Sequence, residues 1–211
     1  MAEIVEAGVR VRFALEYDGP IWQSNGLEAE QLAKTVTELD ALGCCPVLND
    51  GFAAGNAAVR TAEGKLLVTP SGRTPGALSS DDLIEIVDVQ LPAWRVRYRA
   101  RSASLRPTSD TMLHVAVLER AWTHPTPNAS LHGHVLDDEN DALLLGLPCS
   151  PEETLFSTRA DFEATVTLLR GAPYPHHHAW IRKGHGFIAA HDDLASALEV
   201  VRDLLDRRNA L

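Results

Sequence analysis

The chain has 211 residues and carries 29 Asp and Glu against 19 Lys and Arg, which gives a formal net charge of −10 at pH 7. No basic cluster with interleaved aromatic residues offsets this acidity, so neither nucleic acid nor an anionic membrane is an expected partner. No stretch approaches the roughly 20 apolar residues that a membrane span requires. We expect a soluble, cytoplasmic protein with one domain over residues 1–211.

The N-terminal part of the chain alternates between strand and helix signals. Residues 9–14 alternate apolar and polar side chains and predict a strand within an N-terminal extension, residues 1–26. Residues 27–42 place Leu and Val at helical spacing and predict a helix that Gly43 ends.

Two strands and a short helix are predicted next. The strands, residues 57–61 and 65–69, form a hairpin because Gly64 lies in the turn, where positive φ is needed. Ser79 and Ser80 are expected to cap a short helix that runs through Ile86.

The second half of the chain also mixes helices and strands. The apolar spacing of residues 108–122 predicts a helix, and residues 129–135 predict a strand that enters the core. Thr158, with Asp161 three positions later, resembles a capping box and predicts a helix that runs to residue 169. Residues 178–190 contain the last strand, and residues 192–205 form a final amphipathic helix.

Three histidines carry the strongest chemical signal. His132 and His134 are two residues apart, so on a strand they project from the same face and can converge on one ion. His185 lies between Gly184 and Gly186, which let a backbone approach a ligand closely. The pattern predicts a divalent metal site of the catalytic type, with zinc, manganese or cobalt bound by the three imidazoles. The alternative for the pair is two isolated surface histidines.

Polar turns form a second group of candidates. Gly55-Asn56, residues 69–72 and residues 107–110 present hydroxyls and backbone N–H groups of the kind that bind phosphate. Ordinary turn and capping chemistry explains any one of them alone. The cysteines, Cys44, Cys45 and Cys149, form no CxxC motif and are interpreted as buried thiols.

The order of these motifs, with His114 after the third turn, resembles the class II aldolase/adducin family over roughly residues 27–205. The resemblance implies a three-layer α/β/α domain with a mainly antiparallel sheet, assembled as a tetramer with zinc near a subunit boundary. It implies that His132, His134 and His185 bind the metal. It implies a substrate phosphate site at Asn56, Ser71, Gly72, Thr108 and Ser109, and an acid/base role for Asp110.

The expected activity is that of a metal-dependent lyase. It would cleave a small, phosphorylated hydroxy-carbonyl compound by a retro-aldol reaction through a zinc-stabilised enediolate. The alternatives are a dehydratase or epimerase on the same scaffold and a non-catalytic, adducin-like binding domain. A Schiff-base route is disfavoured, because none of the lysines, Lys34, Lys65 and Lys183, has a catalytic setting.

The chain departs from the family pattern at two points and is a short, divergent member. Asp110 stands where the family usually has Glu, which shortens the reach of the carboxylate by about 1.5 Å, one C–C bond. No tyrosine stands where fuculose-phosphate aldolases use one to deliver a proton. The run of His176, His177 and His178 is interpreted as a solvated loop, with a metal-rim or proton-shuttle role as the alternative.

Overall fold

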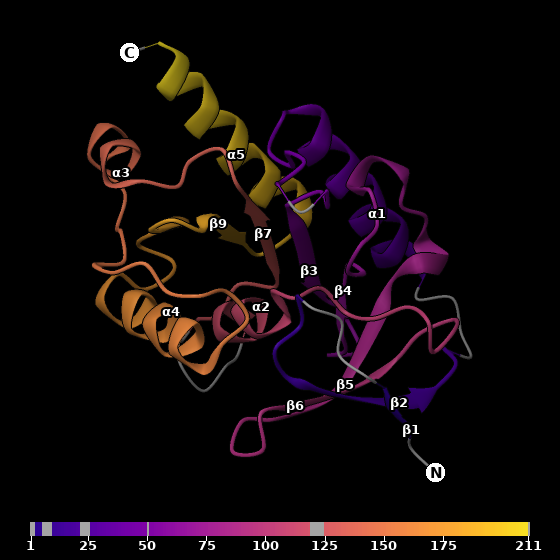
Figure 1. Cartoon of the computed structure of the whole chain (residues 1–211). Coiled ribbons are helices and arrows are strands. Elements are labelled where there is room, and N and C mark those ends of the chain that lie inside the picture. The colour runs from indigo at the N-terminus through magenta and orange to yellow at the C-terminus, as the bar shows by residue number, and fades with distance from the viewer. Residues whose placement is uncertain (1–2, 6–9, 22–25, 50, 119–124, 211) are drawn as a thin grey trace.

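The computed structural model describes residues 3–5, 10–21, 26–49, 51–118 and 125–210. The strands of these residues form one sheet in the order β1–β2–β6–β5–β4–β3–β7–β9–β8 (Figure 1). Their bounds are β1 Glu3–Val5, β2 Ala14–Gly19, β3 Asn56–Arg60, β4 Leu66–Val68, β5 Ile84–Gln90, β6 Arg95–Arg99, β7 Ala129–Gly133, β8 Ala179–Arg182 and β9 Gly186–His191.

The sheet is mixed. β2 and β6 pair in parallel, whereas the other neighbouring strands pair antiparallel. The family resemblance implied a mainly antiparallel sheet, and the parallel pair corrects this to a mixed one. β5 and β6 form an antiparallel hairpin. β2, which belongs to the N-terminal extension, pairs with the other edge of β6 and runs parallel to it.

Helices supply the apolar partners of the sheet. They are α1 Gly26–Ala41, α2 Thr111–Leu118, α3 Glu139–Leu145, α4 Arg159–Gly171 and α5 Leu194–Asn209, with short 3-10 turns at Pro75–Ala77 and Ser80–Asp82. Figure 1 shows α1 and α5 side by side, away from α2 and α4. None of the helices that the structure describes is long and apolar enough to cross a membrane.

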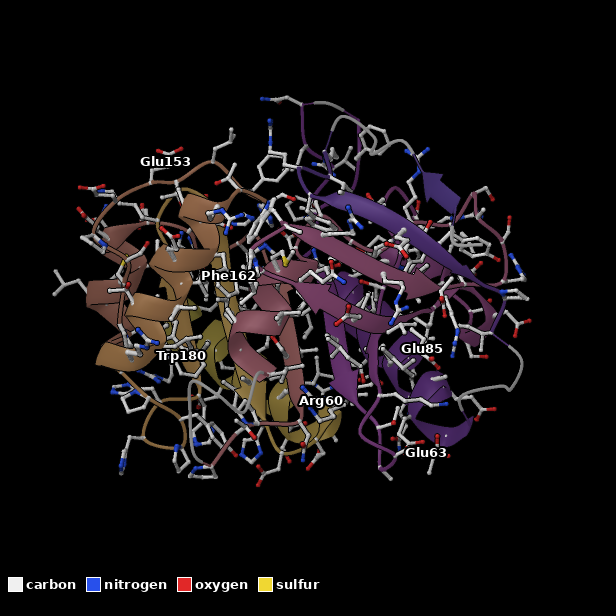
Figure 2. The ribbon with its side chains drawn as sticks, turned by 90° about the horizontal axis from the view of Figure 1, so that it is seen from below. Arg60, Glu63, Glu85, Glu153, Phe162 and Trp180 are labelled. Carbon is white, nitrogen blue, oxygen red and sulfur yellow. The ribbon has the colours of Figure 1, made fainter. Side chains whose placement is uncertain are left out.

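Two buried cores follow from the alternation of side chains along the strands. Ala57 of β3 belongs to the core that α1, α3 and α5 cover, and the next residue, Ala58, belongs to the core of α2 and α4. Phe162 of α4 and Trp180 of β8, labelled in Figure 2, are members of the second core. Because successive strand residues point to opposite faces, strands such as β3, β4 and β8 contribute to both cores.

Several predicted elements are confirmed. The helix predicted for residues 27–42 is α1, and the hairpin predicted around Gly64 is formed by β3 and β4. Thr158 caps α4, since its side chain accepts a hydrogen bond from the N–H of Asp161. Asp193 does the same for α5 with the N–H of Ser196.

The strand predicted for residues 9–14 is wrong. Its first residue lies outside the described ones, and β2 begins only at its last. The alternation is still real, because Val11 and Phe13 are buried while Arg12 is exposed. The backbone N–H of Arg12 donates to Ser157 Oγ at 3.1 Å instead of to a neighbouring strand.

The short helix predicted to reach Ile86 is also wrong. Ser79 does form a capping interaction with Asp82. The backbone N–H of Ser79 donates a hydrogen bond of 3.1 Å to Asp82 Oδ2. The helical part stops at Asp82, and β5 follows because Ile and Val favour the pleated sheet. β1, β2, β5, β6 and α3 were not predicted at these positions.

The last predicted strand, residues 178–190, is a hairpin of β8 and β9. Gly184 turns the chain with φ of 67°, a conformation that glycine adopts without strain. The helix predicted for residues 108–122 starts later, at Thr111, and its last four residues lie outside the described ones.

Gly186 makes a close backbone contact between β9 and the neighbouring strand β7. A Cβ at Gly186 would lie 2.1 Å from the carbonyl oxygen of Gly133, and its φ is 126°. No side chain fits there unless β7 and β9 separate, so this contact fixes the distance between the two strands.

We therefore expect Gly186→Ala to lower the free energy of unfolding by on the order of 3 kcal/mol, from backbone strain and overpacking together. Gly171→Ala is the matched control, because no atom lies within 4 Å of the added Cβ. Its effect should stay within about 0.5 kcal/mol. Urea denaturation followed by circular dichroism measures both, and equal stability of the two variants would contradict the packing argument.

Candidate metal centre and active site

The three predicted histidines meet in space. His132 is in β7, His134 follows the end of that strand, and His185 lies in the turn before β9. The pairing of β7 with β9 sets His132 opposite Ile188 and so brings the turn beside the histidine pair. One ligand nitrogen from each imidazole lies within 4.8 Å of the others.

The donor set fits a divalent metal ion. Nδ1 of His132 lies 2.8 Å from the carbonyl oxygen of Phe187 and donates to it, so its Nε2 carries a lone pair. That Nε2 lies 3.0 Å from Nε2 of His134. Burial, as the main cause, lowers the pKa of His132 to about 4 and that of His134 to about 3, so both rings are neutral and able to ligate.

His185 is held between two carboxylates. Its Nε2 lies 3.3 Å from Asp110 Oδ1, and its Nδ1 lies 3.7 Å from Asp161 Oδ1. Burial alone would lower the pKa of His185, but the two carboxylates outweigh it and raise the pKa to about 9. A metal ion and the proton of a charged His185 compete for the same ring. The negative charge of the two carboxylates therefore favours either a bound metal ion or a protonated ring here.

Asp110 lies just before α2, with its carboxylate directed at the histidines. Its Oδ2 is 4.0 Å from His132 Nε2 and accepts a hydrogen bond of 2.6 Å from Asn56 Nδ2. Burial would raise the pKa of Asp110, but the hydrogen bond and charge of His185 hold it well below the usual range. The group is therefore a buried, ionised carboxylate beside the metal ligands.

A buried hydrogen-bond chain fixes Asp110 from behind. Asn56 Oδ1 accepts from His114 Nε2 at 2.7 Å, and His114 Nδ1 accepts from Ser130 Oγ at 3.0 Å. Burial lowers the pKa of His114 to about 3, which keeps the ring neutral. The sequence placed Asn56 among phosphate ligands, whereas in the structure its amide bonds to Asp110 and His114.

A second buried group lies behind His185 and was missed from the sequence. Arg182 Nη2 donates to Asp161 Oδ1 at 2.7 Å and to Thr154 Oγ1 at 2.5 Å. Asp161 was interpreted only as part of a helix cap. The available signal was Arg182 itself, a charged residue at the end of an otherwise apolar strand, where a buried partner is required.

These groups border one polar cleft. Its lining includes Asp110 and the candidate metal ligands His134 and His185. All the proposed phosphate ligands line it too: Asn56, Ser71, Gly72, Thr108 and Ser109. The turns are joined by the backbone, since the N–H of Thr108 donates to the carbonyl of Thr69. Sequence reasoning missed other lining residues, among them Arg10, Arg73 and Phe156.

The predicted histidine run lies away from the metal site. His176, His177 and His178 line a different groove, beside α5 and His191, and His178 stacks on His191 with 4.7 Å between ring centroids. The structure therefore does not bring this run to the metal site.

The cysteines follow the expectation in part. Cys44 and Cys45 are buried, and burial raises the pKa of Cys44 to about 12. Cys149 is partly exposed, contrary to the expected burial.

Three convergent imidazoles, a buried carboxylate and a polar cleft on an α/β sheet together define a metal-dependent enzyme site. A sequence model described as "Class II Aldolase and Adducin N-terminal domain" matches residues 30–205. The chain belongs to this family, as the order of its motifs predicted.

Named relatives agree with this assignment. A methylthioribulose-1-phosphate dehydratase of Gluconobacter oxydans is 24% identical over 197 residues, which cover 83% of this chain and 86% of that protein. One of Gluconacetobacter diazotrophicus is 35% identical over 99 residues, only 44% of this chain and 43% of that protein. The structure of the L-fuculose-1-phosphate aldolase of Thermus thermophilus matches with a TM-score of 0.58 at 20% identity, covering 87% of this chain and 92% of that one. The matches indicate a metal-dependent enzyme of the lyase type.

The metal site is testable by removing its paired ligands. His132→Ala combined with His134→Ala should reduce bound zinc from about one ion per chain to a trace, because one imidazole cannot hold the ion alone. His176→Ala combined with His177→Ala removes the same number of imidazoles from the other groove and should leave zinc unchanged. Elemental analysis of protein purified without a nickel resin gives both values. Equal zinc in the two variants would refute the site.

Proposed function

We propose that the chain is a zinc-dependent lyase that acts on a small phosphorylated ketose. The observation that carries the proposal is the ionised Asp110, 3.3 Å from a metal-ligand nitrogen of His185 and on the lining of the same cleft. A bound divalent metal would supply a Lewis acid that polarises the substrate carbonyl. Manganese or cobalt would serve the same purpose.

The chain's own residues supply proton transfer and positioning. Asp110 is proposed to take the proton from the carbon next to the carbonyl, because it is ionised and borders the cleft. Asn56 orients it through the 2.6 Å hydrogen bond to Oδ2. Ser71, Gly72, Thr108 and Ser109 are proposed to bind the phosphate through hydroxyls and backbone N–H groups, and Asn56 has one further amide proton to offer.

Dehydration is the reaction that we favour. In a 2-ketose 1-phosphate, loss of the C3 proton to Asp110 and of the C4 hydroxyl, which leaves with a proton as water, gives an enol that becomes a diketone. Two observations support it: both curated relatives above are named dehydratases, and none of the tyrosines, Tyr17, Tyr98 and Tyr174, lines the cleft.

Retro-aldol cleavage is the second candidate, supported by the structural match to a fuculose-phosphate aldolase. There a base takes the C4 hydroxyl proton, the C3–C4 bond breaks, and C3 keeps the electron pair as an enediolate. The three-layer arrangement, the homotetramer and the cytoplasmic location remain expectations from the family resemblance.

The two reactions give different products from one substrate. Incubation of the zinc-loaded protein with methylthioribulose 1-phosphate should give a diketone phosphate and no aldehyde, as followed by ¹³C NMR. An aldehyde with dihydroxyacetone phosphate would establish cleavage instead. Turnover of neither this compound nor fuculose 1-phosphate would refute the ketose phosphate class.

Asp110→Asn tests the proton transfer, because it keeps the shape and removes the basicity. It should lower the exchange of deuterium at the carbon next to the carbonyl of dihydroxyacetone phosphate by roughly two to four orders of magnitude. Zinc content should not change, and Asp110→Glu should retain exchange. NMR measures the rate. Exchange that survives in Asp110→Asn but is lost in His132→Ala would reject Asp110 as the base and keep the metal's role.

A further inference from the structure

The N-terminal extension reaches the cleft, although it lies outside the part of the chain that the family model matches, residues 30–205. Val11 and Phe13 are buried in the core of α2 and α4. The backbone N–H of Arg12 donates to Ser157 Oγ, and the Ser157 side chain is itself buried. These contacts fix the extension against the loop that carries Phe156.

Arg10 lies on this anchored segment and lines the cleft. Its guanidinium carbon is 5.2 Å from the ring centroid of Phe52 and 6.0 Å from that of Phe156. Cation–π contact of this kind orients the plane of an arginine side chain.

The two aromatic rings relate Arg10 to two parts of the cleft. A Cβ at Gly72 would lie 3.6 Å from Phe52, so this ring covers the proposed phosphate turn. The ring of Phe156 is 5.9 Å from that of His185, in the metal cluster. Arg10 therefore lies between the phosphate turn and the metal ligands.

Charge makes the position of Arg10 informative. The chain has a formal net charge of −10, and the cleft contains the ionised Asp110, yet two arginines, Arg10 and Arg73, stand on its lining. Cations in a cleft raise the local concentration of anionic ligands against the field of an acidic protein. A guanidinium also matches the oxygens of a phosphate in a bidentate contact.

We propose that Arg10, presented by the N-terminal extension, binds the phosphate group of the substrate together with the polar turn at residues 69–72. The proposal rests on the phosphorylated substrate class above and adds to it a binding residue outside the family domain. It also gives the extension a function, which is to complete the substrate site.

Isothermal titration calorimetry of the zinc-loaded protein with dihydroxyacetone phosphate, and separately with inorganic phosphate, tests this role. Arg10→Gln should weaken both affinities by about tenfold or more, the usual effect of losing a hydrogen bond to a charged group. Arg10→Lys should recover part of the loss, because the charge remains and the bidentate contact does not. Zinc content should equal that of the wild type in both variants.

Arg12→Gln is the matched control. It removes the same charge from the same segment, and Arg12 also lies over Phe156, at 5.6 Å, but it does not line the cleft. Its affinities should stay within about twofold of the wild type, since exposed charges contribute little. An equal loss in Arg12→Gln, no loss in Arg10→Gln, or no phosphate binding by the wild type would overturn the proposal.

The two proposals fail in different ways. Phosphate binding that depends on Arg10, without deuterium exchange or turnover, would refute the lyase and keep this site. Exchange that depends on Asp110, with phosphate affinity independent of Arg10, would refute the role of Arg10 and keep the lyase.

Discussion

The contact between the backbones of Gly133 and Gly186 is the constraint on which the site depends. It allows β7 and β9 to approach so closely that His132, at the end of one strand, meets His185, just before the other. A side chain at Gly186 would also contact the His132 ring, since its Cβ would lie 3.2 Å from Cε1. The sheet and the metal site therefore share one requirement, which is the absence of a side chain at this point.

Buried charge is the second organising feature. Asp110 and Asp161 lie on either side of His185, and Arg182 offsets the charge of Asp161 from inside the core. Burying these groups costs free energy unless each finds an opposite charge or a hydrogen bond. A cation on the histidines would balance the remaining negative charge of Asp110. The electrostatics of the core and the chemistry of the cleft therefore both favour a cation at this position.

The sequence predicted the parts of the structure that depend on local patterns. The two-residue spacing of His132 and His134 placed them on one face, and the apolar period of α1 gave its bounds to within a residue. Asp161 and Arg182 could not be paired from the sequence, because 21 residues and a helix separate them. Phe156 and Arg10 are brought together only by the packing of the N-terminal extension. The turn at Gly184 was missed, although charged residues and two glycines, residues 182–186, interrupt the apolar residues of β8 and β9.

The series of hydrogen bonds from Ser130 through His114 and Asn56 to Asp110 has one direction, and this direction limits how protons leave the site. Each donor in it points toward Asp110, and the link next to Asp110 is an amide, which cannot release one proton while accepting another as an imidazole or water can. A proton taken up by Asp110 therefore cannot leave along this path. It can return to the bound molecule or to water in the cleft, so a cleft without water would favour return of the same proton to the substrate.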